Sequence, residues 1–307
     1  MTTKTEHIPP PSSLDDVGAA KKRFRPVRLA TTVIVLLIAV QLLVFMTTNE
    51  KFEWNVVAEY LFYPTVLMGV GVTLLLTFVG MVLGSVLGTF IAAGQLSGSR
   101  TARWFCKVFV GVFRGVPPLV QLIFWFNLAY LVPRIELGLP FASPFFSLPT
   151  NQVMTPLMAA VIGLTLHEAA YMSEIIRAGI ISVDRGQLDA AKAMGFTSGQ
   201  AFRKVTLPQA MRVIIPPTGS QVIGLLKGTS LVSVIGMTDL LLSTQLIYNL
   251  NYKIVPLIIV SVVWYLAVVS VLTAVQRKVE DKFGQGHALT SPTRAAQKLQ
   301  QAKVLEQ

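Results

Sequence analysis

The segment "LDAAKAMGFTSGQAFRKVTLPQ", residues 188–209, combines alanines, basic residues and two points at which a helix should break. The chain around it is far more apolar: 53% of its 307 residues are apolar and only 13% are charged. This composition is typical of an integral membrane protein and not of a water-soluble one. We therefore expect the segment to lie outside the lipid, between membrane-spanning stretches.

Apolar runs of about 18 to 25 residues are long enough, as helices, to cross a hydrocarbon core of about 30 Å. Strands are disfavoured, because the runs are continuously apolar and an open sheet would leave backbone groups unpaired in lipid. The sequence thus predicts an all-α integral membrane protein with about six transmembrane helices. The runs lie at 29–46, 66–93, 108–132, 155–176, 213–236 and 254–275.

The basic residues are distributed unevenly between the two sides that these runs would separate. Of the 26 Lys and Arg residues, 21 lie in the segments 1–28, 94–107, 177–212 and 277–307, and the intervening loops hold only Lys51, Arg134 and Lys253. Basic residues concentrate in cytoplasmic loops, so the N- and C-termini are both predicted to be cytoplasmic. The same rule accounts for the net charge of +11, and nucleic-acid binding is not indicated.

The two ends of the chain differ from its middle. Residues 1–28 are polar and rich in Pro and Ser, and they predict a disordered cytoplasmic tail. The run at 29–46 lacks a signal-peptide cleavage pattern and should remain as an N-terminal transmembrane anchor. Residues 281–307 predict a polar cytoplasmic C-terminal tail. The single cysteine, Cys106, excludes an internal disulfide.

The loop that contains the opening segment predicts two short helices. Asp184 lies where the first helix should begin, and Gly195 lies where a left-handed turn should end it. Thr197 and Gln200 have the spacing of a capping box, and "TLP" at 206–208 is expected to stop the second helix. The loop offers alanine and glycine where interfacial helices carry bulky residues, which favours docking into another protein over lying on lipid.

These residues carry a resemblance to a known family. The loop resembles the EAA motif of ABC-importer permease subunits, with Asp in place of Glu and Val in place of Ile, in Asp189, Ala190, Ala191, Gly195, Val205, Leu207 and Pro208. The stretches "FRGVPPLVQLIFWF" (113–126), "AAYMSEIIRAGIISVDRGQLDAAKAMG" and "LPQAMRVIIPPTGSQVIGLLKGTSLVSVIG" look like the polar amino-acid branch of that family. The similarity covers residues 65–280.

The resemblance implies a type I permease bundle over 65–280, in a bacterial cytoplasmic (inner) membrane, that imports a polar amino acid or related small solute. The loop at 184–208 would be docked by an ATPase subunit. The chain has no phosphate-binding loop, so ATP and Mg would be bound by that partner and this chain would be neither an enzyme nor a cofactor carrier. An external substrate-binding protein and a second permease chain, identical or related, are the other implied partners.

Several ionisable or polar side chains lie inside the predicted spans. His167, Glu168 and Tyr171 lie in the fourth run and Lys227 lies in the fifth, where a charge costs on the order of 3 kcal/mol. Their residue types fit either a substrate path or hydrogen bonding between helices. Because Glu168 and Lys227 have opposite charges at similar depth, we expect them to face each other.

Other residues of the runs predict packing. Glu174 and Arg177, three residues apart, are expected to form a structural ion pair near the cytoplasmic end of the fourth run. Gly80, Gly84 and Gly88 have the spacing of a close-packing helix face. Pro117, Pro118, Pro216 and Pro217 are expected to kink or start spans.

The alternative function is a secondary transporter driven by an ion gradient, in which His167 and Glu168 would couple protons. A gene for an ATPase and one for a binding protein beside this gene would favour the importer. A membrane enzyme is disfavoured, because the chain has no HExxH or nucleophile motif.

The uneven basic residues generate a topological prediction. Reporter domains fused to the N-terminus and to the C-terminus should both be active in the cytoplasm and inactive outside it. A reporter fused between the first two runs, near Lys51, serves as the external control. An external signal from either terminus would mean that one of the six runs, most simply 29–46, does not cross the membrane.

Overall fold

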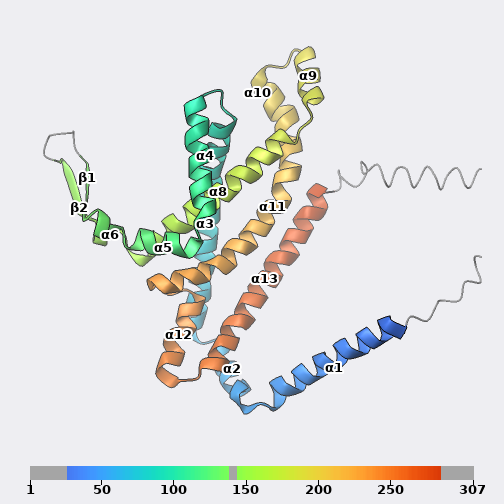
Figure 1. Ribbon diagram of the computed structural model, residues 1–307, viewed down its shortest axis with the longest axis vertical. Helices are drawn as coiled ribbons and strands as arrows, with labels where there is room; N and C mark the ends of the chain where they lie inside the picture. Colours follow the sequence, from blue (N-terminus) through green and yellow to red (C-terminus); the bar gives the residue numbers. More distant parts are fainter. Residues whose placement is uncertain (1–25, 138–143, 285–307) are drawn as a thin grey trace, which may run out of the picture. The chain divides into compact units, whose positions relative to one another are not determined.

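The computed structural model describes residues 26–137 and 144–284 (Figure 1). Within these residues the chain is helical except for one two-stranded hairpin. It divides into two units, one ending at Phe52 and the other beginning at Glu53. The expected tails, 1–28 and 281–307, lie mostly outside the described residues; helix α1 begins at Pro26 and helix α13 ends at Gly284, each inside an expected tail.

The first unit consists of α1 (Pro26–Thr48) and a 3-10 turn, η2 (Glu50–Phe52). The stretch Ala30–Thr48 is long and apolar enough to cross a membrane, in agreement with the predicted anchor at 29–46. At its end the rings of Phe45 and Phe52 meet edge to face with their centroids 5.8 Å apart. This contact packs the 3-10 turn against the end of α1.

The second unit contains the remaining helices. Its first half comprises α2 (Trp54–Leu61), α3 (Pro64–Leu96), α4 (Arg100–Gly115), α5 (Pro118–Phe126), α6 (Leu128–Leu131), β1 (Arg134–Leu137), β2 (Phe146–Pro149), α7 (Thr150–Val153) and α8 (Pro156–Ile181). Its second half comprises α9 (Arg185–Ala193), α10 (Ser198–Ala201), a π-helical turn η3 (Phe202–Thr206), α11 (Leu207–Gly228), a 3-10 segment η4 (Thr229–Ile235), α12 (Leu240–Asn251) and α13 (Ile254–Gly284).

The described residues contain fewer candidate membrane spans than the six or so that the sequence predicts. Among the described residues, three helices are long and apolar enough to cross a membrane: Ala30–Thr48, Pro64–Leu96 and Ile254–Phe283. Two bent pairs raise the number to as many as five, with bends of 102° between α4 and α5 and 45° before α12. Helix α8 has 26 residues but is not among them, because polar residues such as His167 and Glu168 interrupt its apolar sequence.

Helices α3 and α8 form the central contact of the second unit, and α8 crosses α3 in Figure 1. Gly84 and Gly88 allow this approach: a Cβ on Gly84 would lie 2.7 Å from the Glu168 Cβ, and one on Gly88 would lie 2.9 Å from the Met172 Cβ. Gly80, one turn earlier, meets Leu225 of α11. The predicted glycine face is therefore a close-packing surface, and its main partner is α8.

Two further contacts hold the ends of α2, one against α13 and one against the turn between α12 and α13. The Trp264 indole N–H donates to the Leu61 carbonyl at 2.7 Å, and Lys253 forms an ion pair with Glu53. The buried Val56 and Val57 form the inner side of α2. The sequence predicts no helix at 54–61, because eight residues are too few for a membrane span and the apolar face of α2 becomes evident only against α13.

The bend between α4 and α5 follows from its prolines. Pro117 and Pro118 lack backbone N–H groups, and Val116 takes the extended conformation that a following proline favours. The carbonyls left without helical partners are satisfied by the buried Gln121, whose Nε2 donates to Phe113 at 3.0 Å and to Val116 at 2.8 Å. Pro216 and Pro217, by contrast, lie inside α11, which continues through them.

The contact at Gly84 generates a stability prediction. Gly84→Ala should lower the stability of the protein in detergent by about 1 to 3 kcal/mol, because the added methyl group overlaps Glu168. Gly71→Ala on the same helix is the matched control: a Cβ there meets nothing within 4 Å, so this change should be neutral or slightly stabilising. Equal melting temperatures for the two variants would contradict close α3–α8 packing.

The bend generates a second prediction, on Gln121. Gln121→Leu keeps the size of the side chain and removes both hydrogen bonds to the bend, so it should cost about 1 to 3 kcal/mol of stability. Gln187→Leu, the same change at an exposed helical position, is the control. Thermal unfolding in detergent measures both, and a Gln121→Leu protein as stable as the control would show that water satisfies these carbonyls instead.

Candidate functional site

The loop between α8 and α11 carries the residues of the EAA-like motif. Asp184 caps α9, accepting a hydrogen bond from the Gly186 N–H at 2.7 Å. The helix ends in a left-handed turn at Gly195, where φ is +79°. The Phe196 N–H donates to Ala191 at 3.0 Å and the Gly195 N–H donates to Lys192 at 2.9 Å, which together form a Schellman motif. The predicted role of Gly195 in ending the helix is confirmed.

The second half of the loop differs from the prediction. The Thr197–Gln200 capping box is present and starts α10 as expected. The predicted stop at 206–208 is wrong, because α10 continues through the π-helical turn into α11 without a break. In this wider turn the Leu207 N–H reaches back five residues to Phe202, which moves the carbonyls of the turn away from the ring of Pro208. Pro208 therefore lies in the first turn of α11.

The motif residues divide into an inner and an outer set. Ala191 is fully buried and Val205 is partly buried, so these two hold the hairpin together. Asp189, Ala190 and Gly195 are exposed, and Asp189 lies 3.6 Å from the Lys192 ammonium. The last two motif residues, Leu207 and Pro208, are exposed at the start of α11. Within the outer set, Ala190 and Gly195 leave the loop surface without bulky side chains at those two positions.

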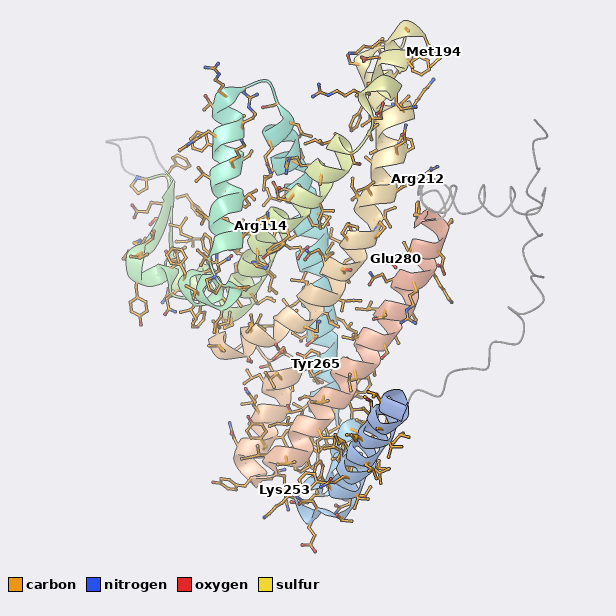
Figure 2. The ribbon with its side chains drawn as sticks, turned by 45° about the vertical axis from the view of Figure 1, so that its right-hand side comes forward. Arg114, Met194, Arg212, Lys253, Tyr265 and Glu280 are labelled. Carbon is orange, nitrogen blue, oxygen red and sulfur yellow. The ribbon has the colours of Figure 1, made fainter. Side chains whose placement is uncertain are left out.

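Two side chains that the helical spacing assigns to the apolar faces of these helices are exposed. Met194 is 66% exposed and lies at the end of the loop in Figure 2, and Phe202 is 42% exposed. Phe196 is held instead under Lys204, whose ammonium lies 5.4 Å from the ring centroid. The exposure of Met194 could have been predicted from its position directly before Gly195. The helix ends there, so the methionine side chain has no buried helix face to pack on.

The polar residues of α8 point to two different neighbours. The rings of His167 and Tyr171 lie 4.9 Å apart, and the Arg114 guanidinium of α4 lies 5.1 Å from the Tyr171 ring centroid. Glu168 is only 1% exposed and packs against Gly84 of α3. His167 and Tyr171 therefore form, with Arg114, a partly exposed polar cluster, from which Glu168 is turned away.

The expected pairing of Glu168 with Lys227 is wrong. In the described part of the chain the two form no ion pair, the Glu168 Oε1 has no hydrogen-bond partner, and Lys227 is exposed at the end of α11. Depth along two helices can be read from sequence, but the direction in which each side chain leaves its helix depends on packing. Glu168 is directed to α3 because only a glycine face leaves room for it.

The predicted ion pair between Glu174 and Arg177 is formed. Arg177 donates to both carboxylate oxygens of Glu174, at 3.2 and 2.8 Å, three residues along α8. Both side chains are partly exposed, so the energy of this pair is modest. Its position near the start of the loop stiffens the last turns of α8.

A buried polar joint at Asp239 was also missed. Its carboxylate caps α12 by accepting from the Leu242 N–H at 2.9 Å, and it accepts from the Tyr265 hydroxyl of α13 at 3.3 Å. The Leu240 N–H next to it donates to Thr73 of α3 at 3.2 Å. The Asp before an apolar run is an N-cap signal, but Tyr265, which donates to it, and Thr73, which accepts from the neighbouring Leu240, lie far away in sequence.

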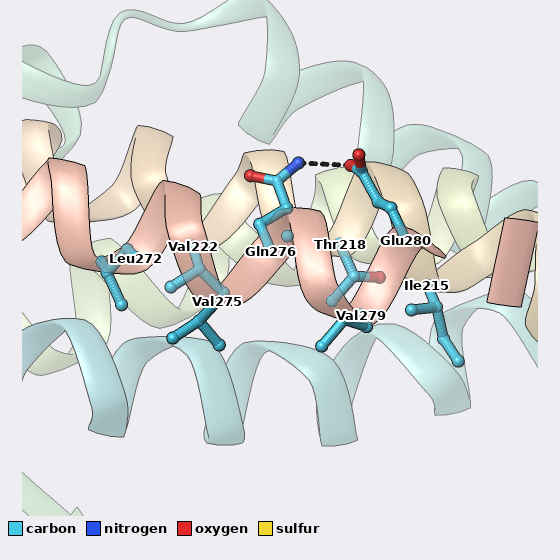
Figure 3. A pocket seen from close by; sticks show the side chains of 9 residues that line it. Ile215, Thr218, Val222, Leu272, Val275, Gln276, Val279 and Glu280 are labelled. Atoms are coloured by element: carbon cyan, nitrogen blue, oxygen red, sulfur yellow. Dashed lines mark hydrogen bonds between the residues drawn. The ribbon is translucent and has the colours of Figure 1, made fainter. Parts of the chain in front are cut away.

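One apolar groove lies between α11 and α13 (Figure 3). It has a volume of about 240 Å³, and its lining includes Val222, Leu272 and Val275. The polar groups at its edge are already paired, because the Gln276 amide donates to Glu280 at 2.7 Å. The groove therefore has the chemistry of a surface for apolar chains and not of a site for a charged solute.

Comparisons with known proteins agree with this architecture. Residues 80–285 match the family described as binding-protein-dependent transport system inner membrane component. The chain is 36% identical to the arginine transport system permease protein ArgU of Corynebacterium glutamicum, over 90% of this chain and 86% of that protein. It is 39% identical to the glutamate/aspartate import permease protein GltK of Escherichia coli, over 62% of this chain and 79% of that protein.

Solved structures give the same result. An amino acid ABC transporter crystallised with histidines is 31% identical, with a TM-score of 0.61 over 71% of this chain and 94% of that one. The MetNI methionine ABC transporter, 20% identical with a TM-score of 0.55, shares the fold. These matches overturn the alternative of an ion-gradient-driven carrier. The chain belongs to the family of inner-membrane permease components of binding-protein-dependent ABC transport systems.

Proposed function

We propose that this permease moves a polar amino acid or a related small solute into the cytoplasm, driven by a separate ATPase subunit that docks on residues 184–208. The observation that carries the proposal is the exposed helical hairpin with its Schellman turn, joined without a break to α11. ATP and Mg²⁺ belong to the partner, since this chain has no phosphate-binding loop.

The outer surface of α9 suits insertion into a groove. Ala190 is exposed with a small side chain and Gly195, just after the helix, is exposed with none, so the backbone of a partner can approach closely. Met194 adds one flexible apolar side chain that can fill an irregular pocket. Among the described residues Asp189 is paired only with exposed Lys192, and this pair can exchange partners at little cost.

A continuous helix connects the loop to the membrane helices and can transmit its movement. From Ser198 to Ile235 the chain is helical throughout, through α10, η3, α11 and η4. Helix α11 packs along both α8 and α13. A closing ATPase that displaces the hairpin at α10 would therefore move α11 as a rigid body against both neighbours, and α9 would act on α10 through the turn at Gly195.

The substrate class rests on relatives and on side-chain chemistry. The names of relatives specify arginine, glutamate/aspartate and L-cystine, which differ in charge but are all polar amino acids. We place His167 and Tyr171 beside the substrate path, because they are partly exposed next to Arg114. Lys227, exposed and without an ion pair in the described structure, can contact a substrate carboxylate. Glu168 is assigned to helix packing.

Two further partners complete the proposed assembly. An external substrate-binding protein would deliver the solute, in keeping with the family description. A second permease chain, identical or related, would form the other half of the translocation path.

The Schellman turn generates the decisive prediction. Gly195→Ala should reduce ATP-driven uptake of labelled amino acid about fivefold or more in reconstituted complex, because alanine at φ +79° costs about 1 to 2 kcal/mol. The same substitution at Gly199 is the matched control: its Cβ would also meet nothing within 4 Å, but its backbone is helical. Gly199→Ala should retain nearly normal uptake.

Two outcomes would contradict the proposal. Normal uptake and normal ATPase co-purification with Gly195→Ala would remove the coupling role of the loop. Wild-type complex that transports none of a panel of acidic, basic and neutral polar amino acids, but does transport another solute, would remove the substrate class while leaving the coupling role intact.

A further inference from the structure

The hairpin of β1 and β2 has two chemically different faces. Ile135 lies opposite Leu148, and Glu136 lies opposite Ser147. Because successive side chains of a strand point to opposite sides, Phe146 shares the face of Ile135 and Leu148. One face is therefore apolar and the other is polar.

The side chains of the polar face hydrogen-bond with one another. The Arg134 Nε donates to the Ser147 hydroxyl at 2.8 Å, and that hydroxyl donates to Glu136 at 3.1 Å. Arg134 and Glu136 lie 3.7 Å apart and cancel each other's charge. This face is stable in water and offers no net charge to attract a charged protein partner.

The apolar face has no sufficient cover within the described chain. Phe146 is 44% exposed and Leu148 is 37% exposed, and the adjoining Phe145 and Tyr130 are 78% and 88% exposed. A two-stranded hairpin is marginally stable by itself in water. Something outside the described chain must cover these side chains if the hairpin is to persist.

The position of the hairpin indicates what that cover is. It connects the end of the bent α4–α5 pair with the start of α8, and in Figure 1 it extends from α6. Its base is fixed, since the fully buried Thr150 donates its N–H to Pro133 at 3.0 Å. A connection between two membrane helices emerges at a membrane surface, the depth at which exposed Tyr and amphipathic elements are enriched.

We propose that this hairpin lies in the lipid headgroup region, with the face of Ile135, Phe146 and Leu148 turned toward the acyl chains and the Arg134–Glu136–Ser147 face turned toward water. Its partner is thus the bilayer surface, and the neutral polar face suits zwitterionic lipid as well as anionic lipid. The exposed Tyr130 ring adds an interfacial anchor at the base. Lipid contact would hold the ends of α5 and α8 at a constant depth while other helices move.

Nitroxide labels test the proposal in the full-length permease, in proteoliposomes without other proteins. Cys106 is first replaced by Ala, and single cysteines are placed at Phe146, Ser147 and Leu148. Collision rates with oxygen, which concentrates in lipid, are compared with those of a water-soluble nickel chelate. Leu266→Cys, on the exposed side of α13, and Thr101→Cys, in the first turn of α4, are the lipid and water references.

The ratio of oxygen to nickel collisions is expected to alternate along β2. At 146 and 148 the ratio of oxygen to nickel collisions should exceed that at 147 several-fold and approach that of the lipid reference. Three water-like ratios would overturn the proposal. Shielding of 146 and 148 from both reagents would also overturn it, because a protein surface, such as a second copy of this chain, would then be the cover.

A conservative variant protects the test against misfolding of the labelled proteins. Phe146→Trp and Ser147→Trp are compared in liposomes with brominated acyl chains, each against the fluorescence of the parent protein. The added emission of Phe146→Trp should be strongly quenched and that of Ser147→Trp weakly quenched. Equal quenching of the two would contradict an interfacial hairpin.

Discussion

The close approach of α3 and α8 is the constraint on which the second unit depends. Without side chains at Gly84 and Gly88, the backbone of α3 can lie directly against α8, and dispersion contacts replace the hydrophobic driving force that lipid does not supply. This contact determines which way the polar side chains of α8 point. Glu168 is directed into the glycine face, and His167 and Tyr171 are left on the side of Arg114.

Around this contact the helices are interrupted. At each break a specific side chain or turn accommodates the backbone groups that lose their helical partners. Gln121 supplies donors to the carbonyls at the proline bend, and Asp239 supplies acceptors at the start of α12. Gly195 allows the left-handed turn that ends α9. Unpaired backbone groups are costly in a membrane, so a permease can contain broken helices only where such compensation is present.

The connection of the loop to the bundle has a mechanical consequence. Had the second helix stopped at 206–208, a movement of α9 would have been lost in a flexible joint. The π-helical turn instead keeps Ser198 and Gly228 on one helical rod while accommodating Pro208. A π-helical turn at this point is consistent with the tendency of such turns to occur at functional positions.

The sequence by itself determined the local features of this protein. Continuous apolar runs specified membrane helices, Gly195 specified a left-handed turn, Thr197 specified a helix start, and the combined motifs specified the permease family. These features depend on the backbone chemistry of a few neighbouring residues or on the spacing of residues along the sequence. Both can be read without knowledge of the rest of the fold.

Only the tertiary structure decided which residues meet across helices. It separated Glu168 from Lys227, joined Asp239 to Tyr265, and revealed the amphipathic hairpin at β1 and β2. It also showed that, of the two proline pairs, Pro117 and Pro118 bend the chain, by 102° between α4 and α5, while Pro216 and Pro217 leave α11 unbroken. The physical reason is that rotation about a helix axis, and the angle at a break, are set by packing against partners distant in sequence, which periodicity and charge do not encode.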